Sequence, residues 1–126
     1  MKIKTIVTGA AGRMGRQVVS ALQQQPDIQM VGGVDLQKQD ITVSSGQTDS
    51  ILKITTDLSA LIVKTRPNVL VDFTHPSSVM DNVRCALRSG VRCVVGTTGL
   101  TASDLEEIRS LCEMKKTGAG IAPNFA

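Results

Sequence analysis

Two periods of hydrophobic and polar positions alternate along the chain. Short apolar runs, typical of buried strands, are followed by stretches in which apolar residues recur every three or four positions, as on one face of a helix. The apolar runs predict strands at residues 3–8, 29–35, 69–73, 91–95 and 120–122, with a shorter one at 51–54. The helical stretches predict helices at residues 13–25, 57–64 and 77–89, and a fourth after Thr101, whereas the polar residues 36–50 predict a loop.

Turn and cap residues stand where these helices should begin and end. Pro26 follows the first helix, and Asp57 precedes the second with a side chain suited to an N-cap. Gly90 follows the third helix, where glycine commonly ends a helix, and Thr101 and Asp104 have the spacing of a capping box before the fourth. Strands that alternate with helices in this way predict an α/β fold of three layers, a doubly wound, mostly parallel sheet of about six strands with helices on both faces.

Composition narrows the class of protein. Of the 126 residues, 41% are hydrophobic and 20% are charged, as in an ordinary globular domain, and we treat residues 1–126 as one domain. The net charge of +3 comes from scattered residues and does not require nucleic acid, and no apolar run approaches the roughly 18 residues of a membrane span. Cys85, Cys93 and Cys112 form no CxxC pair, so we expect no metal site, and reduced thiols favour a cytoplasmic location.

The first predicted strand leads directly into a glycine turn, GAAGRMG, and then into the first predicted helix. Glycine allows a tight turn and lets backbone amides at a helix N-terminus approach a pyrophosphate closely. The combination predicts a Rossmann-type dinucleotide site whose turn consists of Gly9, Ala10, Ala11, Gly12, Arg13 and Met14, while Gly15 allows the helix to pack near the strand. A plain βα turn is the alternative, and Arg13 either contacts phosphate or is simply solvated. A P-loop is excluded because the GK[ST] ending is missing.

Asp35 ends the second predicted strand, 20 residues after Gly15. This is the position of the acid that accepts both hydroxyls of the adenosine ribose in dinucleotide-binding folds. A carboxylate there repels a 2′-phosphate, which slightly favours NADH over NADPH. Lys38 is placed to offset that repulsion, whereas Leu36 is not. The alternative interpretation of Asp35 is a turn acid at a strand end.

Three further segments follow predicted strands, and ligands in this fold bind at the carboxyl ends of the strands. Asp72 is expected to cap the next helix or to hold the loop, and His75, the single histidine, is either a turn residue or a cofactor contact. Asn124 is suited to hydrogen-bond a nicotinamide carboxamide. The predicted cofactor contacts in these segments are Phe73, Thr74 and His75, then Gly96, Thr97 and Thr98, and finally Ala122, Pro123, Asn124 and Phe125.

The segments GAAGRMG, VDFTHP, GTTGL and APNFA, in this order and spacing, make the chain resemble the N-terminal domain of the 4-hydroxy-tetrahydrodipicolinate reductase (dihydrodipicolinate reductase) family. The likeness covers essentially the whole chain, and residues 72–100 are most similar to the branch found in cyanobacteria and plastids. The family reduces a cyclic imine-type intermediate of lysine and diaminopimelate synthesis with NADH or NADPH. The resemblance implies a cytoplasmic protein, or one of the plastid stroma, and cofactor roles for residues 9–14, Asp35, 96–98 and 122–125. His75 falls where many members carry a basic residue.

The resemblance also implies what this chain does not contain. The family's catalytic histidines and lysine and its substrate-binding residues lie in a second domain, through which the family mainly assembles into oligomers, and no matching segment occurs here. We therefore expect no catalytic residues in this chain, cofactor binding without turnover, and a truncated form of a longer protein. Many members that use NADPH well carry an arginine where this chain has Leu36.

Two other functions compete with a reductase of this family. The opening VTGAAGRMG also fits the TGxxGxxG motif of extended short-chain dehydrogenases, but their Tyr-x-x-x-Lys pair is missing because the chain has no tyrosine. A stand-alone nucleotide-sensing module without catalysis would fit a natural end at Ala126.

Overall fold

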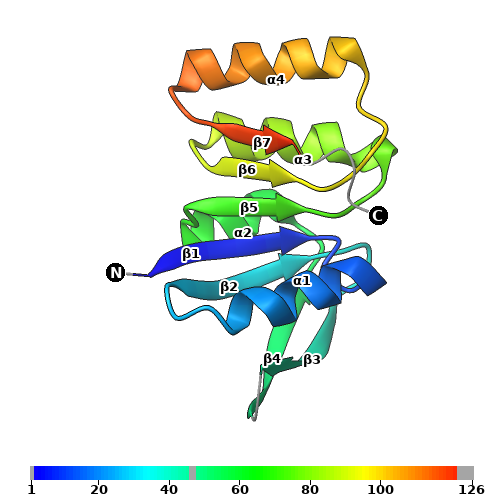
Figure 1. Cartoon of the computed structure of the whole chain (residues 1–126), viewed down its shortest axis with the longest axis vertical. Coiled ribbons are helices and arrows are strands. Elements are labelled where there is room, and N and C mark those ends of the chain that lie inside the picture. The colour runs from blue at the N-terminus through cyan, green and yellow to red at the C-terminus, as the bar shows by residue number, and fades with distance from the viewer. Residues whose placement is uncertain (1, 46–47, 122–126) are drawn as a thin grey trace.

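A seven-stranded sheet organises the residues that the structure, a computed structural model, describes: 2–45 and 48–121 (Figure 1). The strands are β1 (Ile3–Thr8), β2 (Ile28–Val34), β3 (Gln39–Ser45), β4 (Thr48–Thr55), β5 (Val69–Asp72), β6 (Arg92–Val95) and β7 (Ala119–Ile121). The helices are α1 (Arg13–Gln23), α2 (Leu58–Thr65), α3 (Pro76–Arg88) and α4 (Ala102–Lys115). The strand order is β3-β4-β2-β1-β5-β6-β7, and all neighbouring pairs are parallel except β3 and β4. The predicted doubly wound, mostly parallel sheet is confirmed.

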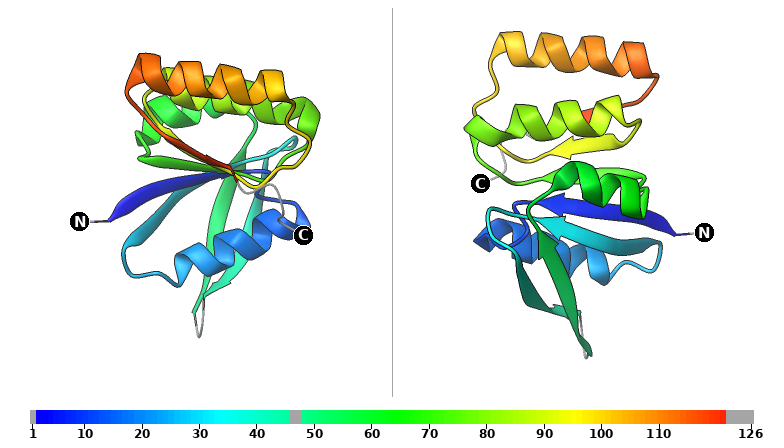
Figure 2. Two further views of the ribbon diagram at one scale, coloured as in Figure 1. Left: turned by 45° about the horizontal axis from the view of Figure 1, so that its top comes forward. Right: turned by 180° about the vertical axis from the view of Figure 1, so that it is seen from behind.

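Helices cover both faces of this sheet. The helix α1 lies on one face, and α2, α3 and α4 lie on the other, as Figures 1 and 2 show. In the central strand β1, Ile6 packs into the core on the α2–α4 side and Val7 into the core beneath α1, and both are fully buried. A central parallel strand is buried on both faces, and the consecutive apolar residues Ile6 and Val7 meet this requirement in β1.

Residues 36–50 do not form the predicted loop, because β3 and the first part of β4 make an antiparallel hairpin there. Ile41 and Val43 of β3 are only 2% and 3% exposed, and they pack beneath α1 together with Leu52 and Ile54 of β4. These two apolar residues alternate with polar ones, so the stretch has the period of a half-buried strand although its overall composition is that of a loop. The described sheet therefore has seven strands instead of about six.

The predicted caps are confirmed. The Asp57 carboxylate accepts a hydrogen bond from the Ala60 N–H at 3.0 Å at the start of α2. Thr101 and Asp104 each accept the other's backbone N–H at 3.0 Å at the start of α4, which is a complete capping box. Gly90 follows α3 with a φ of +77°. Within the described ranges, no helix is long and apolar enough to cross a membrane.

Candidate functional site

Two glycines of the turn between β1 and α1 are required by backbone packing. Gly9 has a φ of +76°, and a Cβ there would overlap the carbonyl oxygen of Phe73. A Cβ on Gly15 would overlap the carbonyl oxygen of Gly9 and lie 2.9 Å from Cα of Ala10. Because these neighbours are backbone atoms, only glycine lets α1 pack against the end of β1 and lets the turn touch the loop after β5. The role predicted for Gly15 is confirmed.

Gly12 is different, because a larger residue would fit there. It is the N-cap of α1 with a φ of −73°, and a Cβ would have one neighbour, the Gly9 carbonyl oxygen at an ordinary contact distance of 3.5 Å. In the described part of the chain no side chain caps this helix, and its first turn contains no acid. The amides of Arg13 and Met14 therefore lie at the positive end of the helix dipole, where an anion is favoured.

Asp35 follows β2 directly, and its carboxylate faces the glycine turn. Its Oδ2 accepts a hydrogen bond from the Ala11 N–H at 2.9 Å, and its Oδ1 accepts one from the Leu36 N–H at 2.8 Å. The carboxylate thus holds one amide of the turn in place, while the amides of Arg13 and Met14 begin the helix beyond it. The side chain of Leu36, 83% exposed, marks the outer rim of this region.

A fully buried carboxylate, Asp72, lies at the end of β5. It accepts hydrogen bonds from Thr8 Oγ1 at the end of β1 (2.6 Å), from Thr97 Oγ1 after β6 (2.5 Å) and from Asn82 Nδ2 in α3 (3.0 Å). Thr74, in the loop after β5, donates its backbone N–H at 3.2 Å and its hydroxyl at 2.9 Å. The prediction that Asp72 holds the loop is confirmed.

The loops after β5 and β6 are packed against each other. A Cβ on Gly96 would lie 2.6 Å from Cζ of Phe73, so the absence of a side chain at Gly96 makes room for the aromatic ring. Gly99, with a φ of +90°, would similarly place a Cβ 2.9 Å from Cγ of Pro76. His75 is exposed and occupies the N-cap position of α3. Among the described residues, its side chain makes no capping hydrogen bond to this helix.

Most of the predicted site residues gather at one edge of the sheet. Residues 9–14, Asp35, 73–75 and 96–98 follow the carboxyl ends of β1, β2, β5 and β6, which are adjacent strands (Figure 1). Ala122, Pro123, Asn124 and Phe125 lie outside the described residues. The gathering is what the sequence predicted, and the contact of each residue with a cofactor stays a prediction.

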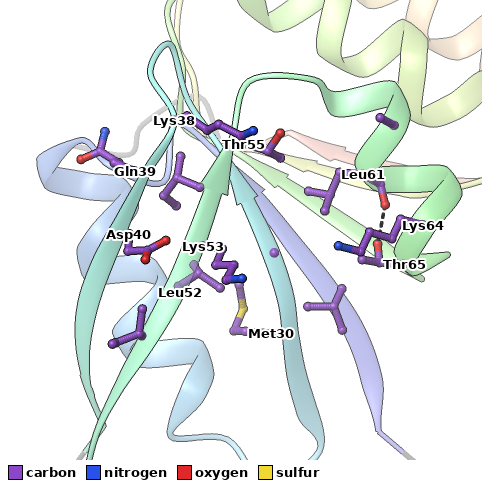
Figure 3. Close-up of a pocket in the computed structure, with 15 residues that line it drawn as sticks. Met30, Lys38, Gln39, Asp40, Leu52, Lys53, Thr55, Leu61, Lys64 and Thr65 are labelled. Atoms are coloured by element: carbon purple, nitrogen blue, oxygen red, sulfur yellow. Dashed lines mark hydrogen bonds between the residues drawn. The ribbon is translucent and has the colours of Figure 1, made fainter.

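A hollow of about 970 Å³ lies beside this edge, between α2 and the β3–β4 hairpin (Figure 3). Lys38 and Thr55 line it near the carboxyl ends of the strands, and Lys53 and Lys64 line it farther down. The Thr55 carbonyl accepts the Asp35 N–H at 3.0 Å, so the hollow adjoins the Asp35 side of the edge. Among the described residues, none of the glycine turn or of the loops after β5 and β6 lines it.

Burial and an ion pair shift pKa values of residues on α3, β6 and α4. Burial raises the pKa of the Cys93 thiol to about 12 and also raises the pKa values of Cys85 and Cys112, all three of which are free thiols. Arg84 donates hydrogen bonds to Glu107 at 2.5 and 2.9 Å, and these bonds hold the pKa of Glu107 below its usual range. In the described ranges no group of three or more metal-ligating side chains occurs.

The model of a protein family described as "Dihydrodipicolinate reductase, N-terminus" matches residues 3–125. The chain belongs to the dihydrodipicolinate reductase family. The 4-hydroxy-tetrahydrodipicolinate reductases of Synechocystis sp. and Desulfitobacterium hafniense are 48% and 46% identical to it over 98% and 99% of its length. The resemblance drawn from the sequence motifs is therefore confirmed.

A solved dihydrodipicolinate reductase shares the fold. The enzyme from a Paenisporosarcina species, determined with dipicolinate bound, matches all of this chain with a TM-score of 0.81 and 30% identity. This chain covers 49% of that structure and 48% of each of the two relatives above, so it spans about half the length of the reductases it matches.

Two residues at the carboxyl-end edge of the sheet, which hold the buried Asp72, were not identified from the sequence. Thr8 and Asn82 hydrogen-bond to Asp72 although they are 64 and 10 residues away from it along the chain. Thr8 ends a strand that also contains Lys4 and Thr5, and Asn82 lies among the apolar residues of one face of α3, so neither position forms a motif. A fully buried acid at a strand end requires donors, and this is the signal that would have directed a search for them.

Proposed function

We propose that this chain is the NAD(P)H-binding half of a 4-hydroxy-tetrahydrodipicolinate reductase of lysine and diaminopimelate synthesis. The observation that carries the proposal is the hydrogen bond between the Asp35 carboxylate and the Ala11 amide, next to the uncapped start of α1. It brings a carboxylate suited to bind sugar hydroxyls beside amides suited to bind phosphate. A dinucleotide contains a sugar and a phosphate joined in this way.

The residues present fit such a cofactor. The amides of Arg13 and Met14 would hold the pyrophosphate, because Gly12 leaves their approach open. Asp35 would accept the adenosine ribose hydroxyls on the side where Lys38 and Thr55 line the hollow. The loops at 73–75 and 96–98, together with 122–125, would receive the nicotinamide end. When bound, the reduced nicotinamide supplies a hydride, and the part of this chain is to hold and orient it.

The Asp35 carboxylate favours NADH slightly over NADPH. Its two oxygens already accept two backbone amides, so a 2′-phosphate would face a fixed negative charge at short range. Lys38 is the nearest cation along the chain that would offset this repulsion, since the residue next to the acid is the uncharged Leu36.

The family resemblance implies that the groups needed to reduce the cyclic imine-type substrate lie outside this chain, which spans about half the length of its relatives. The single histidine, His75, is exposed on the loop after β5, and we assign no proton-transfer role to it or to the buried Asp72. We therefore expect this chain to bind the dinucleotide and to lack turnover by itself.

Titration of the chain with NADH and with NADPH, followed by the fluorescence of the reduced nicotinamide, tests this proposal. Gly12→Ala is the informative variant, because its methyl group fits the fold but stands beside the proposed phosphate position. Loss of one hydrogen bond to a charged phosphate should weaken binding about tenfold. Gly118→Ala is the matched control, since a Cβ there meets nothing within 4 Å and Gly118 lies before β7. Absence of binding of both coenzymes at millimolar concentration would contradict the proposal.

A further inference from the structure

We propose that Asp72 is a positioning residue for the nicotinamide end of the site, although it is too deeply buried to touch a cofactor itself. The inference rests on the proposed function and extends it, because it assigns a task to a buried polar cluster that the binding of phosphate and ribose does not use. This cluster, called the Asp72 network below, consists of Asp72, Thr8, Thr74, Asn82 and Thr97.

The Asp72 network joins four separate elements at one carboxylate. Oδ1 receives the Thr97 hydroxyl and the backbone N–H of Thr74, and Oδ2 receives the Thr8 hydroxyl and the Asn82 amide. Thr97 also accepts the Thr74 N–H at 2.9 Å, so the loops after β5 and β6 are tied directly to each other. The end of β1 and the helix α3 complete the connection, and both oxygens of the carboxylate are used.

The composition of the network indicates a task beyond packing. A buried carboxylate is costly unless hydrogen bonds or a cation compensate for its lost hydration. In the described part of the chain the ion pairs involve Arg84 and Arg109 and none reaches Asp72, so its hydrogen-bond partners there are neutral donors. A buried position of β5 that only needed to be filled would be served by an apolar residue, as at Leu70 two positions earlier, which is also fully buried. Directed donors instead fix the positions of the loops that carry them.

Apart from Thr8, which directly precedes the glycine turn, the network ties elements of one half of the site. The loops that it ties, at residues 73–75 and 96–98, are those that the proposed function gives to the nicotinamide. The other half has its own fastening, since Asp35 holds the glycine turn through Ala11 and the start of the next loop through Leu36. Disturbing Asp72 should therefore weaken contacts to the nicotinamide and leave contacts to the adenosine and phosphates in place.

The test compares the binding of two ligands, NADH and ADP-ribose, by calorimetry. ADP-ribose contains the adenosine, pyrophosphate and second ribose but no nicotinamide. In Asp72→Asn the new amide group faces donors, and in Thr8→Val one donor is lost at a fully buried position that no ligand touches. We expect each variant to bind NADH about tenfold more weakly, which corresponds to the loss of about one hydrogen bond to a charged group. The affinity for ADP-ribose should be unchanged.

Two further variants separate positioning from general stability. Thr5→Val is the matched control, because Thr5 is a buried threonine of the same strand whose hydroxyl, among the described residues, bonds only to the Ile3 carbonyl at 3.3 Å. It should leave the affinities for both ligands unchanged. Thr8→Ser keeps the hydroxyl and should restore NADH binding, which also provides a test if Asp72→Asn does not fold.

The outcomes separate the inference from the proposed function. If the unmodified chain binds neither ligand, both are wrong. If it binds both ligands but the Asp72 and Thr8 variants lose NADH and ADP-ribose equally, or lose neither, Asp72 is not a positioning residue, and the proposed function stands. Loss of NADH affinity that Thr8→Ser does not restore would also overturn the inference, because the hydroxyl would then not be the cause.

Discussion

Replacing Gly15 by alanine should destabilise this protein, although the same substitution stabilises most helices. In a helix interior, alanine is favoured over glycine by about 1 kcal/mol. Here the new Cβ would overlap the Gly9 carbonyl oxygen and lie 2.9 Å from Cα of Ala10. Both are backbone atoms at the end of the central strand, so the overlap is relieved only if α1 moves away from the sheet.

The magnitude follows from two opposing contributions. Overpacking a close contact costs roughly 1–3 kcal/mol, and overlap with backbone atoms belongs to the upper part of that range. After subtraction of the helix preference, we expect a net loss of about 1–2 kcal/mol in the free energy of unfolding. For a domain of this size that corresponds to a fall in Tm of roughly 4–8 °C. Thermal unfolding followed by circular dichroism measures it, and the displaced helix should also weaken NADH binding.

Two glycines near the turn, Gly12 and Gly15, and the distant Gly118 then provide an internal comparison. Gly12→Ala should weaken NADH binding with little change in Tm, because its Cβ has room, whereas Gly15→Ala should lower both. Gly118→Ala should change neither by much, or raise Tm slightly through the loss of unfolded-state entropy. A Gly15→Ala variant as stable as the unmodified chain would refute the view that α1 is seated on β1 by a glycine-only contact.

Three further results are expected, one from Asp35 and two from the cysteines. Asp35→Ala should narrow the preference for NADH over NADPH, because it removes the charge that repels a 2′-phosphate. Parallel titrations with both coenzymes measure the ratio of the two dissociation constants. An unchanged ratio would contradict the assignment of Asp35 to the adenosine ribose. The Cys93 thiol should react with Ellman's reagent only on unfolding, whereas the half-buried Cys85 and Cys112 react in the folded chain. Since burial raises the pKa of Cys93 from 9.0 to about 12, the unfolded chain releases this proton first, and stability should fall as the pH rises between these values. The control is Cys93→Ala, which lacks this thiol. If the free energy of unfolding of the unmodified chain falls above pH 8 by no more than that of Cys93→Ala, this explanation is wrong.

Much of the fold was predictable because its core strands are buried on both faces. A run such as residues 3–8 or 69–72 has few alternatives to a central strand, and the cap residues Asp57 and Thr101 mark their helices by chemistry that acts over three residues. The β3–β4 hairpin was missed because, among the described side chains of β3, only Ile41 and Val43 enter the core, so its pattern rests on two residues in a polar stretch.

The sequence predicted which strand ends form the candidate site, but not which side chains contact one another there. The order of strands in this fold brings residues 9–14, Asp35, 73–75 and 96–98 to one edge, so their gathering follows from the topology. Which donors meet at Asp72 depends instead on the register of β1 against β5, which pairs Thr8 with Asp72. Register is a property of the assembled sheet, and the sequence contains no local pattern that sets it for these two residues.

Attempts to change coenzyme specificity should leave residue 9 unaltered. Gly9 touches the backbone of Phe73, so a side chain at residue 9 would push on the loop after β5. The rim beyond Asp35 has no such restriction, because Leu36 is 83% exposed and Lys38 borders an open hollow. Selection for a new coenzyme, in the laboratory or in nature, is therefore expected to act through residues 36–38 while the glycine turn stays constant.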